Sequence, residues 1–103
     1  MSYRLFLDDE RDPPRDGKTW IIARSANAAQ AIVIARGFPQ HISFDNDLGS
    51  EVEGRHFALW LIDHELEGKG KFPVDFTFYV HSQNPVAAKA INDLLNRYLS
   101  FRS

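Results

Sequence analysis

The sequence has no cysteine, no long hydrophobic run and no large excess of charge, and each absence excludes a class of protein. Without cysteine there can be no disulfide, thiolate metal site or cysteine nucleophile. No apolar stretch approaches the roughly 20 residues that a membrane-spanning helix needs. The net charge of −2 provides neither a basic surface for nucleic acid nor an acidic tail. We expect no membrane partner and no strong nucleic-acid electrostatic signature.

What the sequence does contain is ordinary for a soluble globular domain. Hydrophobic residues make up 44% and charged residues 25% of 103 residues, which is enough chain for one core without metal or disulfide cross-links. We therefore expect a single domain over residues 1–103. A strand-like run begins at Tyr3, so we expect no signal or transit segment and a cytoplasmic location.

Short apolar runs alternate with helical patterns along the chain, which is typical of an α/β fold with a mainly parallel sheet. The patterns predict strands over 3–7, 19–24, 41–45 and 74–80, and helices over 26–36, 55–67 and 85–99. Ser25 suits the start of the first helix as an N-cap, and Gly37 suits its end. About four strands and three helices should therefore form one sheet with right-handed crossovers.

The direction of the second strand is left open by the sequence. Parallel neighbours usually need a connection of a dozen residues or more, and residues 9–18 barely provide it. The pair Pro13-Pro14 also prevents this segment from forming a regular helix. Both a parallel and an antiparallel second strand are compatible with such a connection.

Three predicted strands end in polar residues, within the stretches LFLDDER (5–11), SFDNDLG (43–49) and FYVHSQNP (78–85). Ligands of an open parallel sheet bind beyond the carboxyl ends of its strands. If the three strands are neighbours, one edge of the sheet gathers four carboxylates, an imidazole and a hydroxyl, from Asp8, Asp9, Asp45, Asp47, His81 and Ser82.

Four carboxylates at one edge repel one another unless a cation neutralises them. Oxygen donors without cysteine favour a hard cation such as Mg²⁺ or Mn²⁺, which also binds phosphate oxygens. Asp8 and Asp9 are adjacent acids at one strand end, opposite the third acid Asp45, and these three are the predicted metal ligands. The expected partner is a small phosphorylated ligand.

The other polar residues at these strand ends each have a functional and a structural interpretation. Arg11 suits a phosphate clamp or a surface ion pair, and Asp47 suits a base or a turn residue. His81 can transfer a proton near neutral pH or simply end a strand. Asn84 suits the N-cap of the last helix, whose N-terminus would also favour an anion. His41 is interpreted only as the start of a strand.

The acidic residues resemble the pocket of response-regulator receiver domains. That resemblance implies that Asp8 and Asp9 bind Mg²⁺ and that Asp45 accepts a phosphoryl group. It further implies a metal contact from the backbone carbonyl of Asp47 and a phosphoryl contact from Ser82. The fold would be a shortened flavodoxin-like, receiver-like three-layer sandwich with strand order 2-1-3-4.

The sequence also departs from ordinary receivers, because the proline-rich segment replaces their first helix and their phosphate-binding lysine strand is missing. These departures resemble a narrower family, the cyclic-phosphate processing receiver-like domains. The matching motifs run from Leu7 to Pro13, from Asp45 to Gly49 and from His81 to Pro85. This resemblance implies a role toward cyclic phosphates of nucleotides or RNA ends.

Two functions follow as hypotheses. One is a metal-dependent phosphoesterase that processes or binds a cyclic phosphate of a nucleotide or RNA end, with Asp45, His81 and Asp47 as catalytic residues. Arg11, Ser82 and Asn84 would bind its phosphate. The alternative is a non-enzymatic, shortened receiver that is phosphorylated at Asp45 or binds a phosphate ligand.

Overall fold

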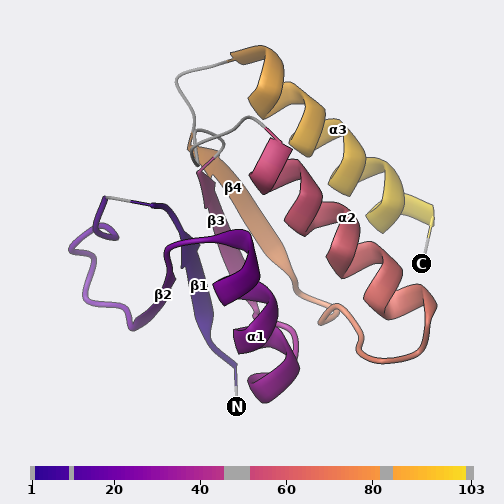
Figure 1. Ribbon diagram of the computed structural model, residues 1–103, viewed down its shortest axis with the longest axis horizontal. Helices are drawn as coiled ribbons and strands as arrows, with labels where there is room; N and C mark the ends of the chain where they lie inside the picture. The colour runs from indigo at the N-terminus through magenta and orange to yellow at the C-terminus, as the bar shows by residue number, and fades with distance from the viewer. Residues whose placement is uncertain (1, 10, 46–51, 82–84, 102–103) are drawn as a thin grey trace.

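The computed structural model describes residues 2–9, 11–45, 52–81 and 85–101, and these form one sheet with three helices (Figure 1). The elements are β1 (Arg4–Leu7), β2 (Trp20–Ala23), α1 (Ala26–Arg36), β3 (His41–Asp45), α2 (Val52–Leu66), β4 (Thr77–His81) and α3 (Pro85–Phe101). The strand order is β2-β1-β3-β4, and each neighbouring pair is parallel. The predicted α/β fold class and strand order are confirmed, and β2 proves to be parallel to β1.

Local signals define α1 at both of its ends. The side-chain oxygen of Ser25 accepts a hydrogen bond from the backbone N–H of Ala28 at 3.1 Å. At the other end, Gly37 has a φ of 85°, and its N–H donates to the carbonyl of Val33 at 2.7 Å. A residue with a side chain would be strained at that φ. The predicted bounds of 26–36 are confirmed.

The bounds of β4 differ from the prediction, since the strand begins at Thr77 and not at residue 74. The backbone N–H of Phe76 donates to the carbonyl of Pro73 at 3.1 Å, which makes a turn just before the strand. The strand then extends through His81. The two later helices are also longer than predicted, because α2 begins at Val52 and α3 continues to Phe101.

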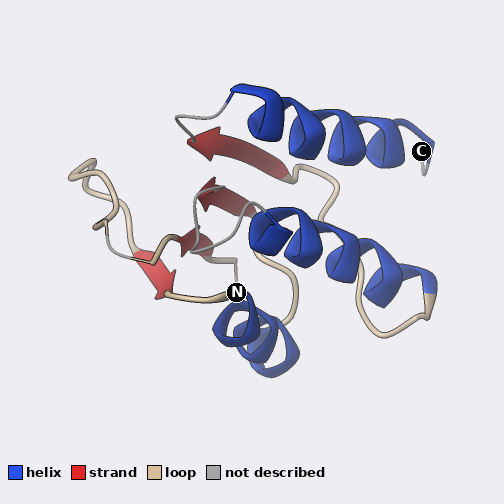
Figure 2. Cartoon of the chain, turned by 45° about the horizontal axis from the view of Figure 1, so that its top comes forward, coloured by secondary structure: helices blue, strands red, loops and turns tan. Residues whose placement is uncertain are grey.

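All three helices cover the same face of the sheet, as Figure 2 shows. Alternate strand residues point toward them, because successive side chains of a strand face opposite sides. The buried core joins strand residues to residues of every helix: Leu5, Leu7, Ile42, Phe44, Ala29, Val33, Phe57, Leu61, Ile91 and Leu95. None of the helices in the described ranges is long and apolar enough to cross a membrane.

The opposite face, which we call the helix-free face, carries the intervening strand residues. They include Arg4, Trp20, His41 and Tyr79. Within the described residues no helix covers this face, and the segment 11–19 lies on its side of the sheet (Figure 2). The third layer expected of the sandwich is therefore not formed by helices here, because the proline-rich connection between β1 and β2 is a loop.

Candidate functional site

The sheet register brings the carboxyl ends of β1, β3 and β4 side by side. Phe44 of β3 pairs with Leu7 of β1, and the next residue, Asp45, pairs with His81 of β4. Asp8 directly follows Leu7. The backbones of Asp8, Asp45 and His81 thus occupy adjacent positions along one edge of the sheet.

The carboxylate of Asp8 is buried and held by the loop that follows it. Its residue has 0% relative exposure. Its Oδ1 accepts a hydrogen bond from the backbone N–H of Arg11 at 2.8 Å, and its Oδ2 lies 4.0 Å from the guanidinium Nε of Arg11. A buried carboxylate needs such compensation, because removing a charge from water is costly. The geometry fixes Asp8 at the sheet edge.

Arg24 is an anchoring residue that the sequence analysis did not single out. It directly follows β2, and its Nη1 donates to the backbone carbonyls of Asp8, at 3.2 Å, and Arg11, at 2.5 Å. Its Nη2 donates to Oδ1 of Asp12 at 3.1 Å. The planar guanidinium can serve several acceptors at once. Arg24 therefore ties the segment after β1 to the neighbouring strand.

Two predicted site residues on this segment reach solvent. The side chain of Arg11 is 44% exposed although it lies beside the buried Asp8 carboxylate, and Asp9 is exposed. Arg11 can therefore present its guanidinium to a ligand while it partly neutralises Asp8.

The remaining predicted site residues lie partly or wholly outside the described residues. Asp47, Ser82 and Asn84 are not described, and for Asp45 and His81 the structure gives the backbone and not the side chain. Within the described residues no group of three possible metal-ligating side chains occurs. The metal set of Asp8, Asp9 and Asp45 and the roles of the other residues stay predictions.

Comparison with known proteins assigns the family of the chain. The family model for the cyclic-phosphate processing receiver domain matches residues 3–97. The chain belongs to this family. The match spans all four strands and most of α3, and it links the chain to cyclic-phosphate processing and to a phosphorylated ligand. No curated protein and no solved structure matches the chain.

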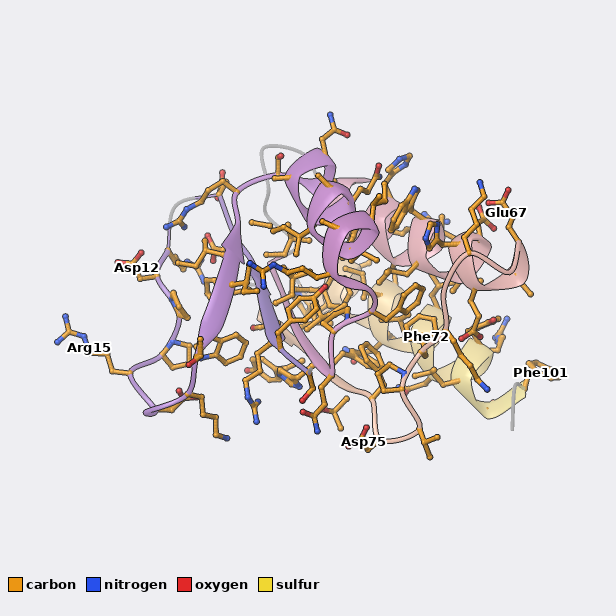
Figure 3. The ribbon with its side chains drawn as sticks, turned by 90° about the horizontal axis from the view of Figure 1, so that it is seen from below. Asp12, Arg15, Glu67, Phe72, Asp75 and Phe101 are labelled. Atoms are coloured by element: carbon orange, nitrogen blue, oxygen red, sulfur yellow. The ribbon has the colours of Figure 1, made fainter. Side chains whose placement is uncertain are left out.

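This cyclic-phosphate processing receiver domain has a second feature, a hollow of about 530 Å³ on its helix-free face. Strand residues form one side of it, among them Trp20, His41 and Tyr79. The segment 11–18 forms the other side; Figure 3 shows Asp12 and Arg15 on this segment, at the end of the molecule away from Phe101. This hollow was not predicted from the sequence, although polar and aromatic residues alternate with core residues in the strands and indicate an uncovered face.

His41 in this hollow is held by contacts on two sides. Its Nδ1 is hydrogen-bonded to Oγ1 of Thr77 at 2.8 Å, and its ring meets Trp20 edge-on at 5.7 Å between centroids. Burial, and then the positive charges of Arg4 and Lys18, lower the pKa of His41. His41 is therefore mainly neutral at pH 7. The residue was interpreted from the sequence only as the start of a strand, but it also forms part of the lining of the hollow.

Proposed function

We propose that this domain is a metal-dependent phosphoesterase that opens a cyclic phosphate of a nucleotide or RNA end. The observation that carries the proposal is the register that makes Asp8, Asp45 and His81 neighbours at the carboxyl edge of three parallel strands. Parallel sheets bind ligands at this edge. Membership in the cyclic-phosphate processing family supports a cyclic phosphate as the proposed ligand class.

The donors available at this edge suit a hard cation. Asp8, Asp9 and Asp45 would hold Mg²⁺ or Mn²⁺ through carboxylate oxygens, and the carboxylate of the buried Asp8 lies 4.0 Å from the guanidinium of Arg11. When bound, the cation would supply positive charge to the phosphoryl oxygens. We do not expect this site to select metals that favour nitrogen or sulfur ligands.

The phosphate would be positioned by groups around the metal ligands. Arg11 is near Asp8, is partly exposed, and carries a guanidinium that matches two phosphate oxygens. We propose further contacts from Ser82 and Asn84, next to the N-terminus of α3, where an anion is stabilised. Asp45 would share in metal binding, or act as nucleophile in the alternative function.

His81 would protonate the ribose oxygen that leaves when the ring opens. That oxygen departs poorly as an alkoxide, and imidazole is a suitable acid near neutral pH. Asp47 is the second proposed acid–base residue, acting on the attacking water. Proton transfer of this kind is worth about 10²–10⁴-fold in rate.

The test is hydrolysis of 2′,3′- and 3′,5′-cyclic nucleotides, and of RNA ending in a cyclic phosphate, with and without Mg²⁺. We expect His81→Ala to lower turnover by about 10²–10⁴-fold and to leave Mg²⁺ affinity nearly unchanged. His81→Gln should not restore turnover, because an amide cannot transfer a proton. His56→Ala, at an exposed position of α2, is the matched control. Full turnover in both His81 variants would contradict the mechanism.

The metal is tested without any turnover. Mg²⁺ or Mn²⁺ should raise the melting temperature of the wild type, since a ligand at 100 times its Kd stabilises the folded state by about 2.7 kcal/mol. Asp8→Asn keeps an oxygen that can accept the hydrogen bond from Arg11, yet it should remove most of the metal-dependent rise. A rise that persists in Asp8→Asn would exclude Asp8 from the metal set.

The alternative function, a receiver phosphorylated at Asp45, is favoured by the adjacency of Asp8 and Asp45 alone. It predicts binding of beryllofluoride, or a stable aspartyl phosphate at Asp45, without turnover of any cyclic phosphate. It also predicts that His81→Ala leaves phosphorylation intact. Those two results together would replace the phosphoesterase proposal.

A further inference from the structure

The hollow on the helix-free face begins next to the proposed phosphate site. Its strand residues form two successive rows across the sheet, the first with Arg4, Trp20 and His41, the second with Phe6, Ser43 and Tyr79. The next row along the strands is that of Asp8, Asp45 and His81. Two residues along a strand advance roughly 6.6 Å, so the nearer row of the hollow lies one such step from the phosphate site.

Aromatic side chains from several strands line the hollow, among them Tyr79 and Trp20. Tyr79 is 62% exposed although it lies in the middle of β4. Trp20 is held in place, because its ring meets Phe6 edge-on at 5.8 Å and its Nε1 donates to Oδ1 of Asp16 at 3.3 Å. Exposed rings beside a groove are the usual surfaces on which nucleic-acid bases stack.

The charges around the hollow favour an uncharged ring that is attached to an anion. Arg4, Arg11 and Lys18 contribute positive charge to its lining. Its two acids are already engaged, since Asp12 pairs with Arg24 at 3.1 Å and Asp16 accepts the backbone N–H of Lys18 at 3.0 Å. A cationic ligand would find no free counter-charge among these two acids, whereas a phosphate would be attracted to the cations.

Arg11 lies both beside the proposed phosphate site and in the lining of the hollow. Its guanidinium Nε lies 4.0 Å from the carboxylate of Asp8, and the residue also lines the hollow. One ligand of nucleotide size can therefore contact the strand ends and the hollow together.

We propose that the hollow binds the base of a nucleoside cyclic phosphate, which stacks on Tyr79 and Trp20 while its phosphate lies at the strand ends. The position of the phosphate rests on the function proposed above, but the base site rests on the hollow itself. The ligand class is a nucleoside whose ribose carries the cyclic phosphate, either free or as the last residue of an RNA. Cyclic phosphates without a base are then poor ligands.

The first experiment measures binding and needs no turnover. Trp60 packs on the helix side, where it stacks on His64 of α2 at 4.5 Å, so Trp60→Phe leaves Trp20 as the single tryptophan reporter. Adenosine 3′-monophosphate should quench this fluorescence, and inorganic phosphate and ribose 5-phosphate should not. Tyr79→Ala should weaken nucleotide binding by roughly 5-fold to 100-fold, because it removes a stacking surface.

Two variants control for effects on folding. Tyr79→Phe keeps the ring and should keep the affinity. Phe101→Ala removes another exposed aromatic, at the far end of α3 (Figure 3), and should leave affinity and quenching unchanged. Equal nucleotide affinity in wild type and Tyr79→Ala overturns the proposal. Absent quenching by the nucleotide in Trp60→Phe, or equal quenching by inorganic phosphate, also overturns it.

The second experiment compares 2′,3′-cyclic AMP, a short RNA ending in a 2′,3′-cyclic phosphate, and glycerol 1,2-cyclic phosphate. The two nucleoside ligands should be preferred over the glycerol ligand, and Tyr79→Ala should reduce that preference by the same roughly 5-fold to 100-fold. The ratio between the first two distinguishes a free nucleotide from an RNA end. If the nucleotide binds as expected but no cyclic phosphate is hydrolysed, the base site stands and the phosphoesterase fails.

Discussion

The two faces of the sheet are built from alternate residues of the same strands, yet only one of them is covered by helices in the described residues. On the helix-covered face, Leu5, Leu7 and Phe44 have 0% exposure and belong to the core. On the helix-free face, Arg4 and Tyr79 border a hollow. Parallel sheets are normally covered on both faces, and their strands are then apolar throughout. Here one face forms the core, and the other carries a hollow that is open to solvent.

The largest expected difference between the faces is in stability. Phe44→Ala removes a fully buried ring from the helix-covered face and should lower the free energy of unfolding by about 3–5 kcal/mol. Tyr79→Ala, on the neighbouring strand but on the other face, should cost about 1 kcal/mol or less, because mainly strand propensity is lost. Urea unfolding of both variants measures the difference.

A loss of 3 kcal/mol or more in Tyr79→Ala would break this comparison, because the helix-free face would then be part of the core. Phe44→Leu serves as the control for the first variant. It preserves most of the buried apolar volume, so it should recover more than half of the loss seen in Phe44→Ala.

The sequence predicted those parts of the fold that local signals determine. Ser25 and Gly37 fix the first and last residues of α1, because each makes a capping hydrogen bond with a residue three or four positions away. The start of β4 could not be predicted from propensity, since Val74 and Phe76 resemble strand residues and only the turn bond to Pro73 separates them from the strand.

Those residues of the candidate site that lie at strand ends could be predicted from the sequence. Asp8, Asp45 and His81 are marked by the change from apolar to polar residues at the end of each strand, and the strand order makes their positions adjacent. Arg24 could not be found in this way, because its acceptors lie 12 to 16 residues earlier in the chain. The hollow exists because no helix of the described residues covers this face of the sheet. In the sequence, the alternation of polar and apolar residues within the strands is the signal of such an uncovered face.

Arg24 provides the next test, because it joins the edge of the sheet to the loop that borders the helix-free face. Arg24→Ala removes hydrogen bonds to Asp8, Arg11 and Asp12. The partly exposed position reduces their value, so we expect a loss of about 1–2 kcal/mol in unfolding free energy. Lysine cannot reach three acceptors with one planar group, so Arg24→Lys should recover less than half.

The control for this test is Arg15→Ala, on the same loop at an exposed position (Figure 3). It should change the unfolding free energy by less than about 0.5 kcal/mol. Equal losses in Arg15→Ala and Arg24→Ala would mean that loop charge in general, and not the anchoring by Arg24, stabilises this region.

The smallest expected effect is a pH dependence confined to the helix-free face, and it arises from His41. Burial, with the charges of Arg4 and Lys18, lowers the pKa of His41 in the folded state, whereas the unfolded chain has the ordinary value of about 6.5. As the pH falls below neutrality, the unfolded state binds its proton first. The folded state should therefore lose stability as the pH drops through 6.5, until His41 is protonated in the folded state as well.

The measurement is the difference in unfolding free energy between wild type and His41→Gln from pH 8 to pH 5, because other groups that titrate in this range cancel in the difference. The wild type should lose stability relative to the variant on the acid side of this range, and NMR titration of the His41 ring should give a pKa below 6.5. A difference that does not vary with pH, or that varies in the opposite direction, would mean that solvent and counter-charge reach His41 freely. The hollow would then lack the partly desolvated, cation-bordered lining that distinguishes it from the rest of the surface, and the contrast between the two faces would be one of packing alone.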